Sequence, residues 1–460
     1  MAAADPIWMM LDRFVFRRDP AESSIEDRSY SFSASHIAGS TPFTVAFRVL
    51  SPPEISRLYL KWPPLLDPMN GSSCDLVAAH DNLLLISLTS SPGTVNTYKS
   101  PVYPQEHFIC RASTSPSQPS LMLHKIPMCT EPLVVRGNKD KVITTQRSFH
   151  PHTVGILCRG DEEFAVAQLS LSRPNLVAGM QADLCVLRSS VHNCDHKWEV
   201  EQQLPIQCKF SESSDLIYWK TDTVIPFKTA LYWVDFCSGG MLFCDVFQER
   251  PAISYLQLPI CNRNPGYEVR PFHDMHRSVC ITKGGQELNF IDVVREDGKH
   301  VGPMSPDTGF TINRYALMTS SCGTLTWKKF VVKSSELDSL ETSPSQALTF
   351  PLVSMDNPNM VHFLLSKKMA DGIDNVSVVT VDMKAKEMVS SHPYIKGNED
   401  LLGKDADMVR RKSHLLQPFI SSRLPKFFNR SRPSASSEKH ITQQEWKVTK
   451  FMASLFLSEF

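Results

Sequence analysis

Two aspartates flank the most apolar hairpin-like segment of the sequence and are the first candidates for acid–base chemistry. Asp235 and Asp245 lie ten residues apart (245 minus 235) within residues 231–246. Two carboxylates held about 5 to 10 Å apart across a cleft can hydrolyse a glycosidic bond. Alternatively, each carboxylate accepts hydrogen bonds from backbone N–H groups at a strand end or turn. We favour this structural role and keep a hydrolase-like site as the alternative.

Histidines and cysteines gather at three places where metal binding is the chemistry to consider. His192, Cys194 and His196 would share one face of a strand. Zinc needs about four ligands, however, and no fourth is spaced nearby, so we interpret this segment as a polar hairpin turn. The histidine pairs in 273–280 and 150–152 sit beside Asp or Pro residues that are typical of loops. The sequence therefore predicts no metal and no cofactor.

The common nucleotide-binding and hydrolase motifs are missing from the sequence. No Gly-x-Gly-x-x-Gly, phosphate-loop, His-Glu-x-x-His or Gly-x-Ser-x-Gly pattern occurs, which lowers the expectation of those enzyme classes. The 48 basic and 48 acidic residues cancel, so we expect no nucleic-acid partner and no membrane association. The first residues do not resemble a secretory signal. We expect a protein of the cytoplasm or nucleus whose 12 cysteines are reduced.

Short strand-like runs dominate the chain and predict an all-β fold. Each run has about 5 to 8 residues, is rich in β-branched or aromatic types and ends at Pro, Gly, Asn, Asp or Ser. The clearest runs are 43–50, 83–88, 154–158, 164–171, 184–187, 253–258, 288–294, 360–365 and 376–381. Amphipathic helices are nearly absent before residue 400, so we expect a sandwich, a barrel or a propeller.

A short repeat favours the propeller among these folds. Gln-Leu-Pro-Ile occurs at 203–206 and again at 257–260, an offset of 54 residues (257 minus 203). Each copy ends a phrase that consists of an apolar strand, a polar turn and a strand with an aromatic residue. A chance match of four residues is the alternative. Because propeller blades repeat about every 40 to 50 residues, we predict β-propeller-like repeats in about six blades.

The chain divides into three predicted regions. Residues 1–35 form a lead-in segment, 36–400 a propeller-like β domain, and 401–460 a basic linker with a short amphipathic C-terminal helix. Two polar stretches, 90–120 and 334–347, are expected to be long loops because they cannot bury enough apolar surface.

The C-terminal region differs in charge from the rest of the chain. Between residues 404 and 450 there are 11 Lys or Arg and 4 Asp or Glu, a net of +7 (11 minus 4). A capping-box sequence at 442–445 precedes apolar residues with helical spacing, which predicts the terminal helix. We interpret the basic stretch as a solvated linker, with nuclear import or binding of an anionic partner as alternatives.

A set of phrases in the sequence resembles a known family. Trp233-Val-Asp235, the Gly-Gly turn that follows and the strand ending at Asp245 are similar to the signature of domain of unknown function (DUF) 1618. Further phrases around Trp219, Pro259 and Trp327 fit the same pattern. The resemblance is densest over 182–395, with its core at 231–330. It departs at residues 237 and 238, where family members more often carry a larger or basic residue.

The resemblance implies a plant protein, from a family expanded in grasses, with a fold similar to the propeller-like domains attached to F-boxes. No enzymatic activity is established for the family, and residues 1–35 contain no F-box helix pair. We therefore expect a non-enzymatic scaffold or adaptor that binds an unidentified protein partner, with a hydrolase-like site in the propeller cleft as the alternative. The signature residues are expected to be structural: Trp233, Asp235, Gly239, Asp245, Pro259, Trp219 and Trp327.

Overall fold

Strands account for most of the structure, as the sequence predicts. The computed structural model describes residues 6–18, 32–38, 41–61, 73–89, 105–113, 120–135, 141–160, 163–173, 179–189, 197–260, 273–299, 304–305, 308–319, 325–338, 348–368, 374–394 and 418–429. Every strand-like run predicted from the sequence overlaps a strand. Within the described ranges, no helix is long and apolar enough to cross a membrane. The all-β prediction is confirmed.

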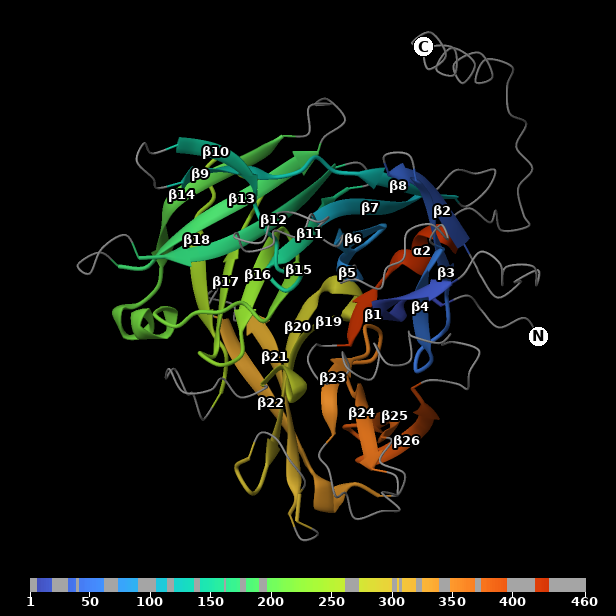
Figure 1. The fold of residues 1–460 in the computed structure, drawn as a ribbon. Coiled ribbons are helices and arrows are strands. Elements are labelled where there is room, and N and C mark those ends of the chain that lie inside the picture. The colour runs from blue at the N-terminus through green and yellow to red at the C-terminus, as the bar shows by residue number, and fades with distance from the viewer. Residues whose placement is uncertain are drawn as a thin grey trace, which may run out of the picture.

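The described strands form five hydrogen-bonded sheets, of nine, eight, four, four and two strands. The nine-stranded sheet divides at the single β1–β5 pair and the eight-stranded sheet divides at the short β14–β18 pairing, which gives, apart from the two-stranded sheet, six groups of strands, here called blades (Figure 1). Blade 1 contains, in spatial order, β27 (Phe419–Ser422), β1 (Met9–Arg18), β4 (Ile55–Lys61), β3 (Thr41–Arg48) and β2 (Phe32–Ala38). Blade 2 contains β5 (Ser73–His80), β6 (Leu83–Thr89), β7 (Gln105–Ser113) and β8 (Ser120–Lys125). Blade 3 contains β11 (Val154–Arg159), β12 (Glu163–Ser172), β13 (Gln181–Ser189) and β14 (Trp198–Gln207).

The second half of the chain forms the other three blades. Blade 4 contains β15 (Thr223–Phe227), β16 (Ala230–Asp235), β17 (Gly240–Cys244) and β18 (Ile253–Gln257). Blade 5 contains β19 (Arg277–Thr282), β20 (Glu287–Arg295), β21 (Phe310–Thr319) and β22 (Leu325–Lys333). Blade 6 contains β23 (Thr349–Val353), β24 (Met360–Lys368), β25 (Asp374–Asp382) and β26 (Glu387–Pro393). A separate hairpin, β9 (Thr130–Val135) and β10 (Lys141–Gln146), lies between blades 2 and 3 in sequence.

The blades close into a ring. The first strands of blades 2 to 6 contact one another in sequence order, from β5 through β11, β15 and β19 to β23. Strand β27 contacts both β23 and β5, which completes the circle. The arrangement confirms the prediction of a propeller-like fold with about six blades.

The inner strands of the blades are buried on both faces, which explains their nearly continuous apolar sequences, whereas outer strands such as β14, β22 and β26 are largely exposed. In β13, Leu184 and Val186 face the core shared with blade 4, whereas Cys185 and Leu187 face the core shared with blade 2. Successive strand residues point to opposite faces, so one apolar run supplies two interfaces. Similar clusters fill the remaining interfaces around the ring.

Residues from both ends of the described chain build blade 1. Met9 of β1 pairs with Ser422 of β27, and Asp12 pairs with Phe419. The short helix α2 (Leu424–Asn429) follows β27 and packs Leu424 and Phe427 into the core between blades 1 and 2. The other described helical elements are single 3₁₀ segments: η3 (Phe210–Leu216), η4 (His273–Met275), η5 (Lys283–Gly285) and η6 (Ser334–Glu336).

Two sequence-based expectations differ from the structure. The stretch 90–120, expected to be a long loop, contains strand β7, whose Phe108, Ile109 and Cys110 are buried. The first Gln-Leu-Pro-Ile copy belongs to β14, and the second begins at Gln257, the last residue of β18, and continues beyond the strand. The first copy thus lies inside β14, where Gln203 has a φ of 59° at a register shift, rather than closing the strand.

The predicted regional boundaries stay predictions. Strands β1 and β27 come from the regions expected to be a lead-in segment and a linker, and they pair inside blade 1. The predicted helix after residue 442 lies outside the described residues, as do most residues of the basic stretch.

Candidate functional site

A cavity of about 290 Å³ lies along the axis of the ring. Every blade contributes residues to its lining. These are Arg13 and 419–423 of blade 1, 78–81 of blade 2, Cys158 of blade 3, 224–228 of blade 4, residues between 278 and 286 of blade 5, and Leu352 and Met355 of blade 6. Part of this lining, including Asp81, Lys228 and Gly284, lies where first strands turn into second strands. We call this end of the ring, formed by residues 80–82, 227–229, 283–286 and 354–359, the turn face.

Arg423 spans the turn face from one side of the cavity to the other. Its Nη2 lies 2.8 Å from Oδ1 of Asp81 in blade 2, and its Nη1 donates a 2.7 Å hydrogen bond to the carbonyl of Gly284 in blade 5. Both members of the ion pair are mostly buried. A charge-assisted contact of this kind is stronger and more directional than a neutral one. Arg423 therefore fixes three blades relative to one another.

Gly285 allows the guanidinium of Arg423 to approach the β19–β20 turn. Its φ of 99° is a conformation that favours glycine, and a Cβ placed there would lie 3.1 Å from Nη2 of Arg423. A larger residue at position 285 would displace the arginine. The positive φ and this close approach together favour glycine at position 285.

His80 and Cys158 are tied together across blades 2 and 3. The backbone N–H of Cys158 donates a 2.8 Å hydrogen bond to Nδ1 of His80, and the Cys158 thiol donates to the carbonyl oxygen of His80 at 3.1 Å. Burial raises the pKa of the Cys158 thiol, so it stays protonated at neutral pH. Burial also lowers the pKa of His80. The neutral imidazole accepts from a backbone N–H and the protonated thiol donates to a backbone carbonyl, so the two side chains do not form an activated nucleophile.

The charged groups around the central cavity are mainly cationic. Among the described residues, Arg13, Lys228 and Arg423 line it together with one carboxylate, Asp81. Burial lowers the pKa of Arg13 to about 10, which still leaves its guanidinium charged at neutral pH. The cavity thus favours anionic or hydrogen-bond-accepting groups over cations.

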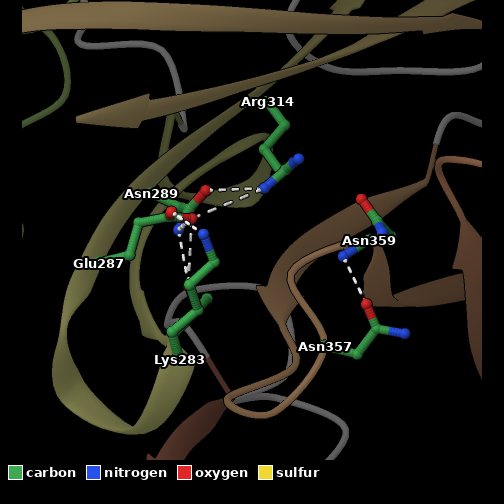
Figure 2. A network of polar contacts seen from close by, with 7 residues as sticks. Lys283, Glu287, Asn289, Arg314, Asn357 and Asn359 are labelled. Atoms are coloured by element: carbon green, nitrogen blue, oxygen red, sulfur yellow. Dashed lines mark hydrogen bonds and ion pairs between the residues drawn. The ribbon is translucent and has the colours of Figure 1, made fainter. Parts of the chain in front are cut away.

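A polar network lies beside the cavity on the β19–β20 turn (Figure 2). Lys283 donates to Glu287 at 2.6 Å, Asn289 donates to Glu287 at 3.1 Å, and Arg314 donates to the amide oxygen of Asn289 at 3.0 Å. Partial burial acts to raise the pKa of Glu287, but the hydrogen bonds from Lys283 and Asn289 and the nearby cations hold it below its ordinary value. The Glu287 carboxylate therefore stays ionised, and it accepts hydrogen bonds from both Lys283 and Asn289.

The same view places this network opposite the β23–β24 turn of blade 6. There the backbone N–H of Asn359 donates to the side-chain oxygen of Asn357 at 3.1 Å, which closes the turn (Figure 2). The N–H of Gly284 reaches the carbonyl of Met355 at 3.4 Å, so the two turns are in contact. Blades 5 and 6 thus present one continuous polar rim.

A second cavity of about 530 Å³ lies between blades 1 and 6. Residues 6–8 and 51–53 line it from blade 1, and strands β24, β25 and β26 line it from blade 6. It adjoins the turn face, because Ser354 and Asp356 line this cavity while the intervening Met355 lines the central one.

The two aspartates singled out in the sequence line neither of these cavities. Asp235 is fully buried, and its carboxylate accepts hydrogen bonds from the backbone N–H groups of Lys220, Cys237 and Ser238 at 2.9–3.0 Å. Asp245 accepts one from the N–H of Phe247 at 3.0 Å. Both carboxylates thus hold backbone turns at the ends of their strands.

The signature tryptophans all donate hydrogen bonds from Nε1. Trp233 is fully buried in the core between blades 3 and 4 and donates to the carbonyl of Thr153 in the neighbouring blade at 3.0 Å. Trp327 of blade 5 reaches the carbonyl of Gln257 in blade 4 at 3.1 Å. Trp219 is half-buried and donates to the Thr221 hydroxyl at 3.1 Å.

Gly239 and Pro259 complete the signature hairpin. Gly239 has a φ of 75°, and its N–H donates to the carbonyl of Asp235 at 3.0 Å. Its own carbonyl accepts from the N–H of Leu258, next to Pro259, at 2.9 Å. The hairpin expected at 231–246 is present as β16 and β17, paired antiparallel from Leu231 and Cys244 to Asp235 and Gly240.

The structure places the histidine and cysteine groups in different settings. Residues 192–196 lie outside the described residues. The pair at 150–152 forms a turn closed by the N–H of Thr153 on the carbonyl of His150 at 2.9 Å. His273 and His276 are buried at the start of blade 5. No group of three His, Cys, Asp or Glu residues placed to hold a metal occurs in the described part of the chain.

The sequence reasoning missed the residues that shape the cavity. Arg423 lies in a stretch interpreted as linker, and Asp81 lies in a two-residue turn with no recognisable motif. The signal that could have found the β19–β20 turn is Gly284-Gly285, which marks a tight connection. Nothing local in the sequence links it to residue 423.

The ring of six blades with an axial cavity defines the class of the protein as a β-propeller. Residues 233–362 match the model of a family described as "Protein of unknown function (DUF1618)". This match supports the DUF1618 family for the chain and begins at Trp233 of the signature. The comparison with curated proteins found no match.

Three solved structures are similar over most of their length but at low scores. A proposed 6-phosphogluconolactonase from Bacteroides fragilis is 9% identical with a TM-score of 0.25, covering 81% of this chain and 98% of that one. One from Bacteroides uniformis is 10% identical with a TM-score of 0.25, at 79% and 96% coverage. The β-fructofuranosidase from Microbacterium saccharophilum is 6% identical with a TM-score of 0.26, at 84% and 85% coverage. Structural similarity at TM-scores this low supports no inference about the activity of this protein.

Proposed function

We propose that the protein is a non-enzymatic interaction scaffold of the DUF1618 family whose protein partner docks on the turn face. The observation that carries this proposal is the arrangement around the central cavity, where Arg423 joins three blades through Asp81 and Gly284. A rigid rim with fixed polar groups suits recognition, because little side-chain entropy is lost on binding. The cationic lining favours a partner that presents a carboxylate or another acceptor group.

The chemistry of the rim also favours binding over catalysis. The side chains of His80 and Cys158 each bind a backbone group of the other residue, and the carboxylates of Asp81 and Glu287 form ion pairs with Arg423 and Lys283. The hydrolase alternative rested on Asp235 and Asp245, which bind backbone N–H groups away from both cavities. We therefore propose a structural role for the seven signature residues.

Several finer features belong to the same proposal. We infer a plant protein of the cytoplasm or nucleus, similar to the propeller-like domains attached to F-boxes, that could act as an adaptor for its partner. The family resemblance supports these features, and the described residues support the scaffold. The proposed role involves no cofactor and no nucleic acid.

A comparative pull-down tests the proposal. Extract from the source organism is passed over immobilised wild-type protein, Lys228→Glu and Lys299→Glu. Lys228 is exposed on the turn face, whereas Lys299 is exposed in the β20–β21 connection at the other end of blade 5. The proposal expects at least one protein to be recovered by wild type and Lys299→Glu but lost with Lys228→Glu. Equal recovery by all three, or reproducible recovery of none, would contradict it.

A further inference from the structure

The cavity between blades 1 and 6 contains buried polar atoms that lack hydrogen-bond partners. His362 of β24 is only 4% exposed and lines the cavity. Its Nδ1 lies 2.9 Å from the hydroxyl of Thr380, but its Nε2 has no hydrogen-bond partner among the described residues. The hydroxyl of Ser390, also in the lining, is likewise buried and unpartnered there. Leaving such groups unpaired costs about 1–3 kcal/mol each, so a partner is expected to fill the space.

These groups form a row across the sheet of blade 6. His362 in β24 is the register partner of Thr380 in β25, and Thr380 is the partner of Ser390 in β26. Cross-strand partners project from the same face of a sheet. The row therefore places the imidazole of His362 and the hydroxyl of Ser390 on one face of the sheet, two strands apart with Thr380 between them.

The opposite wall of the cavity is apolar. Trp8 and the prolines at 6, 52 and 53 line it from blade 1. The Trp8 ring lies 6.0 Å from the ring of His362, tilted by 42°. An occupant thus meets an aromatic and aliphatic surface on one side and hydrogen-bonding groups on the other, which is the usual composition of a small-molecule site.

The charges of the residues that line the cavity between blades 1 and 6 indicate which class of ligand it can bind. No lysine or arginine occurs among the described lining residues, so an anion would find no counter-charge. Asp356 lines the mouth and already accepts a hydrogen bond from the Trp8 side chain. Burial lowers the pKa of His362 to about 4, so the imidazole is neutral at physiological pH. The site is therefore suited to an uncharged ligand.

Hydroxyl groups match the unpartnered atoms best. The neutral imidazole Nε2 is a donor or an acceptor, depending on which tautomer the Thr380 contact selects. A ligand hydroxyl can serve either tautomer, and it can also pair with the Ser390 hydroxyl in either direction. A purely apolar ligand would leave both protein atoms unsatisfied. The C–H faces of a saccharide ring would in turn pack on Trp8 and the prolines.

We propose that the cavity between blades 1 and 6 binds an uncharged saccharide. The volume of about 530 Å³ lies within the range of about 300–1,000 Å³ that is typical of small-molecule sites. His362 and Ser390 hold the ligand hydroxyls, Thr380 orients the imidazole, and blade 1 supplies the apolar wall. The site adjoins the turn face at Ser354 and Asp356 but is a different cavity from the central one.

A pair of shape-matched substitutions tests the site. Ser390→Thr and Ser390→Val have nearly the same volume and differ by one hydroxyl. Saturation-transfer difference NMR is recorded with glucose, galactose, mannose, sucrose and cellobiose as separate probes. We expect at least one probe to bind wild type and Ser390→Thr, and to bind Ser390→Val about ten-fold more weakly, since one lost hydrogen bond is worth roughly 1–1.5 kcal/mol. Thr326→Val, the same kind of change on the exposed outer strand of blade 5, should leave binding unchanged.

A second measurement does not depend on how the variants fold. Hydrogen exchange read by mass spectrometry should show that the bound probe protects residues 360–393 and leaves 310–333 unchanged.

Melting temperatures show whether each variant is folded. Equal binding by Ser390→Val and Ser390→Thr when both are folded, protection confined to other blades, or no binding of any probe would overturn the proposal. The last outcome would mean that the cavity holds water only.

Discussion

Arg423 and Asp81, which lie 342 residues apart in the sequence (423 minus 81), form an ion pair between blades 1 and 2 with Nη2 and Oδ1 separated by 2.8 Å. The same guanidinium donates to the carbonyl of Gly284. Since β27 contacts both β5 and β23, this side chain stands at the closing point of the ring. It therefore links the fold of the C-terminal segment to the shape of the central cavity.

Arg423→Ala should destabilise the protein by about 1–3 kcal/mol, the range for losing hydrogen bonds made by a charged group. Urea unfolding of Arg423→Ala, Asp81→Asn and the double variant measures how strongly the two residues are coupled. Arg159→Ala is the matched control, because Arg159 pairs with Glu163 while more than half exposed, and such pairs contribute about 0–1 kcal/mol. Additive single substitutions at positions 423 and 81 would contradict the coupling.

Trp233→Ala should lower the free energy of unfolding by about 3–5 kcal/mol, as expected for a large aromatic removed from a packed core. The ring is fully buried, and its Nε1 bonds to Thr153 of the neighbouring blade. Chemical denaturation provides the measurement. Trp219→Ala is the comparison, since Trp219 is only half-buried, and it should cost less. An unfolding free energy that Trp233→Ala leaves unchanged would mean that the ring does not support the core.

The sequence was informative wherever neighbouring residues decide the structure. The hairpin of β16 and β17 could be predicted because two apolar runs flank a Gly-Gly turn. Strands buried on both faces, such as β11 and β13, appear as short continuous apolar runs. The family resemblance was carried by the same local phrases.

Features formed by distant residues could not be predicted in this way. Strand β27 pairs with β1, and the Tyr394 hydroxyl donates to Asp12 at 2.7 Å across 382 residues of sequence. Likewise, the unpartnered Nε2 of His362 indicates a candidate binding site only because residues of blade 1 and blade 6 together line a cavity beside it. A single sequence contains no signal for such pairings, because hydrophobic period and turn residues describe only local structure.

Gly240→Ala should destabilise the protein by about 1–3 kcal/mol through overpacking. A Cβ at position 240 would lie 2.4 Å from Cε2 and 2.5 Å from the hydroxyl of Tyr255, whose hydroxyl donates to Asp215 at 3.0 Å. The ring would have to move and lose this bond. Gly179→Ala, where no atom lies within 4 Å, is the control and should change stability by less than about 0.5 kcal/mol. Equal melting temperatures for the two variants would contradict the predicted clash.

Acid should destabilise the fold between about pH 6.5 and pH 4 through its buried histidines. Burial lowers the pKa of His107 to about 4 in the folded protein, whereas an unfolded histidine has a pKa of about 6.5. The unfolded chain therefore binds more protons in this window, and the free energy of unfolding falls by up to about 1.4 kcal/mol per pH unit for each such group.

Urea unfolding of wild type and His107→Gln, followed from pH 7.5 to pH 5, checks this expectation. The variant should show a shallower loss of stability over this range, because one site of proton uptake has been removed. The range stays above pH 5 so that carboxylates contribute little to the slope. Parallel curves for the two proteins would show that His107 titrates alike in the folded and unfolded states.

Cys129 and Cys185 should form a disulfide when the protein is oxidised. Their Sγ atoms lie 3.4 Å apart in the core between blades 2 and 3. The hydrogen bond with Cys185 and the charge of Arg147 lower the pKa of Cys129, which increases its thiolate fraction. Diamide would take up the two hydrogens that the thiols lose, and mass spectrometry under non-reducing conditions would show a linked peptide pair containing residues 129 and 185.

The seven other described cysteines serve as internal controls, because none of them is expected to form a disulfide under this treatment. Cys110, for example, is fully buried in blade 2, and burial raises the pKa of its thiol to about 12. It should stay reduced under the same treatment. Cys129→Ser should abolish the linked pair and leave Cys185 reduced, whereas Cys110→Ser should not affect it. A pair that persists in Cys129→Ser, or oxidation that begins at Cys110, would contradict the assignment. Because Cys129 directly precedes the β9–β10 hairpin and Cys185 lies in β13, the new bond would fasten that hairpin to β13 and slow its hydrogen exchange.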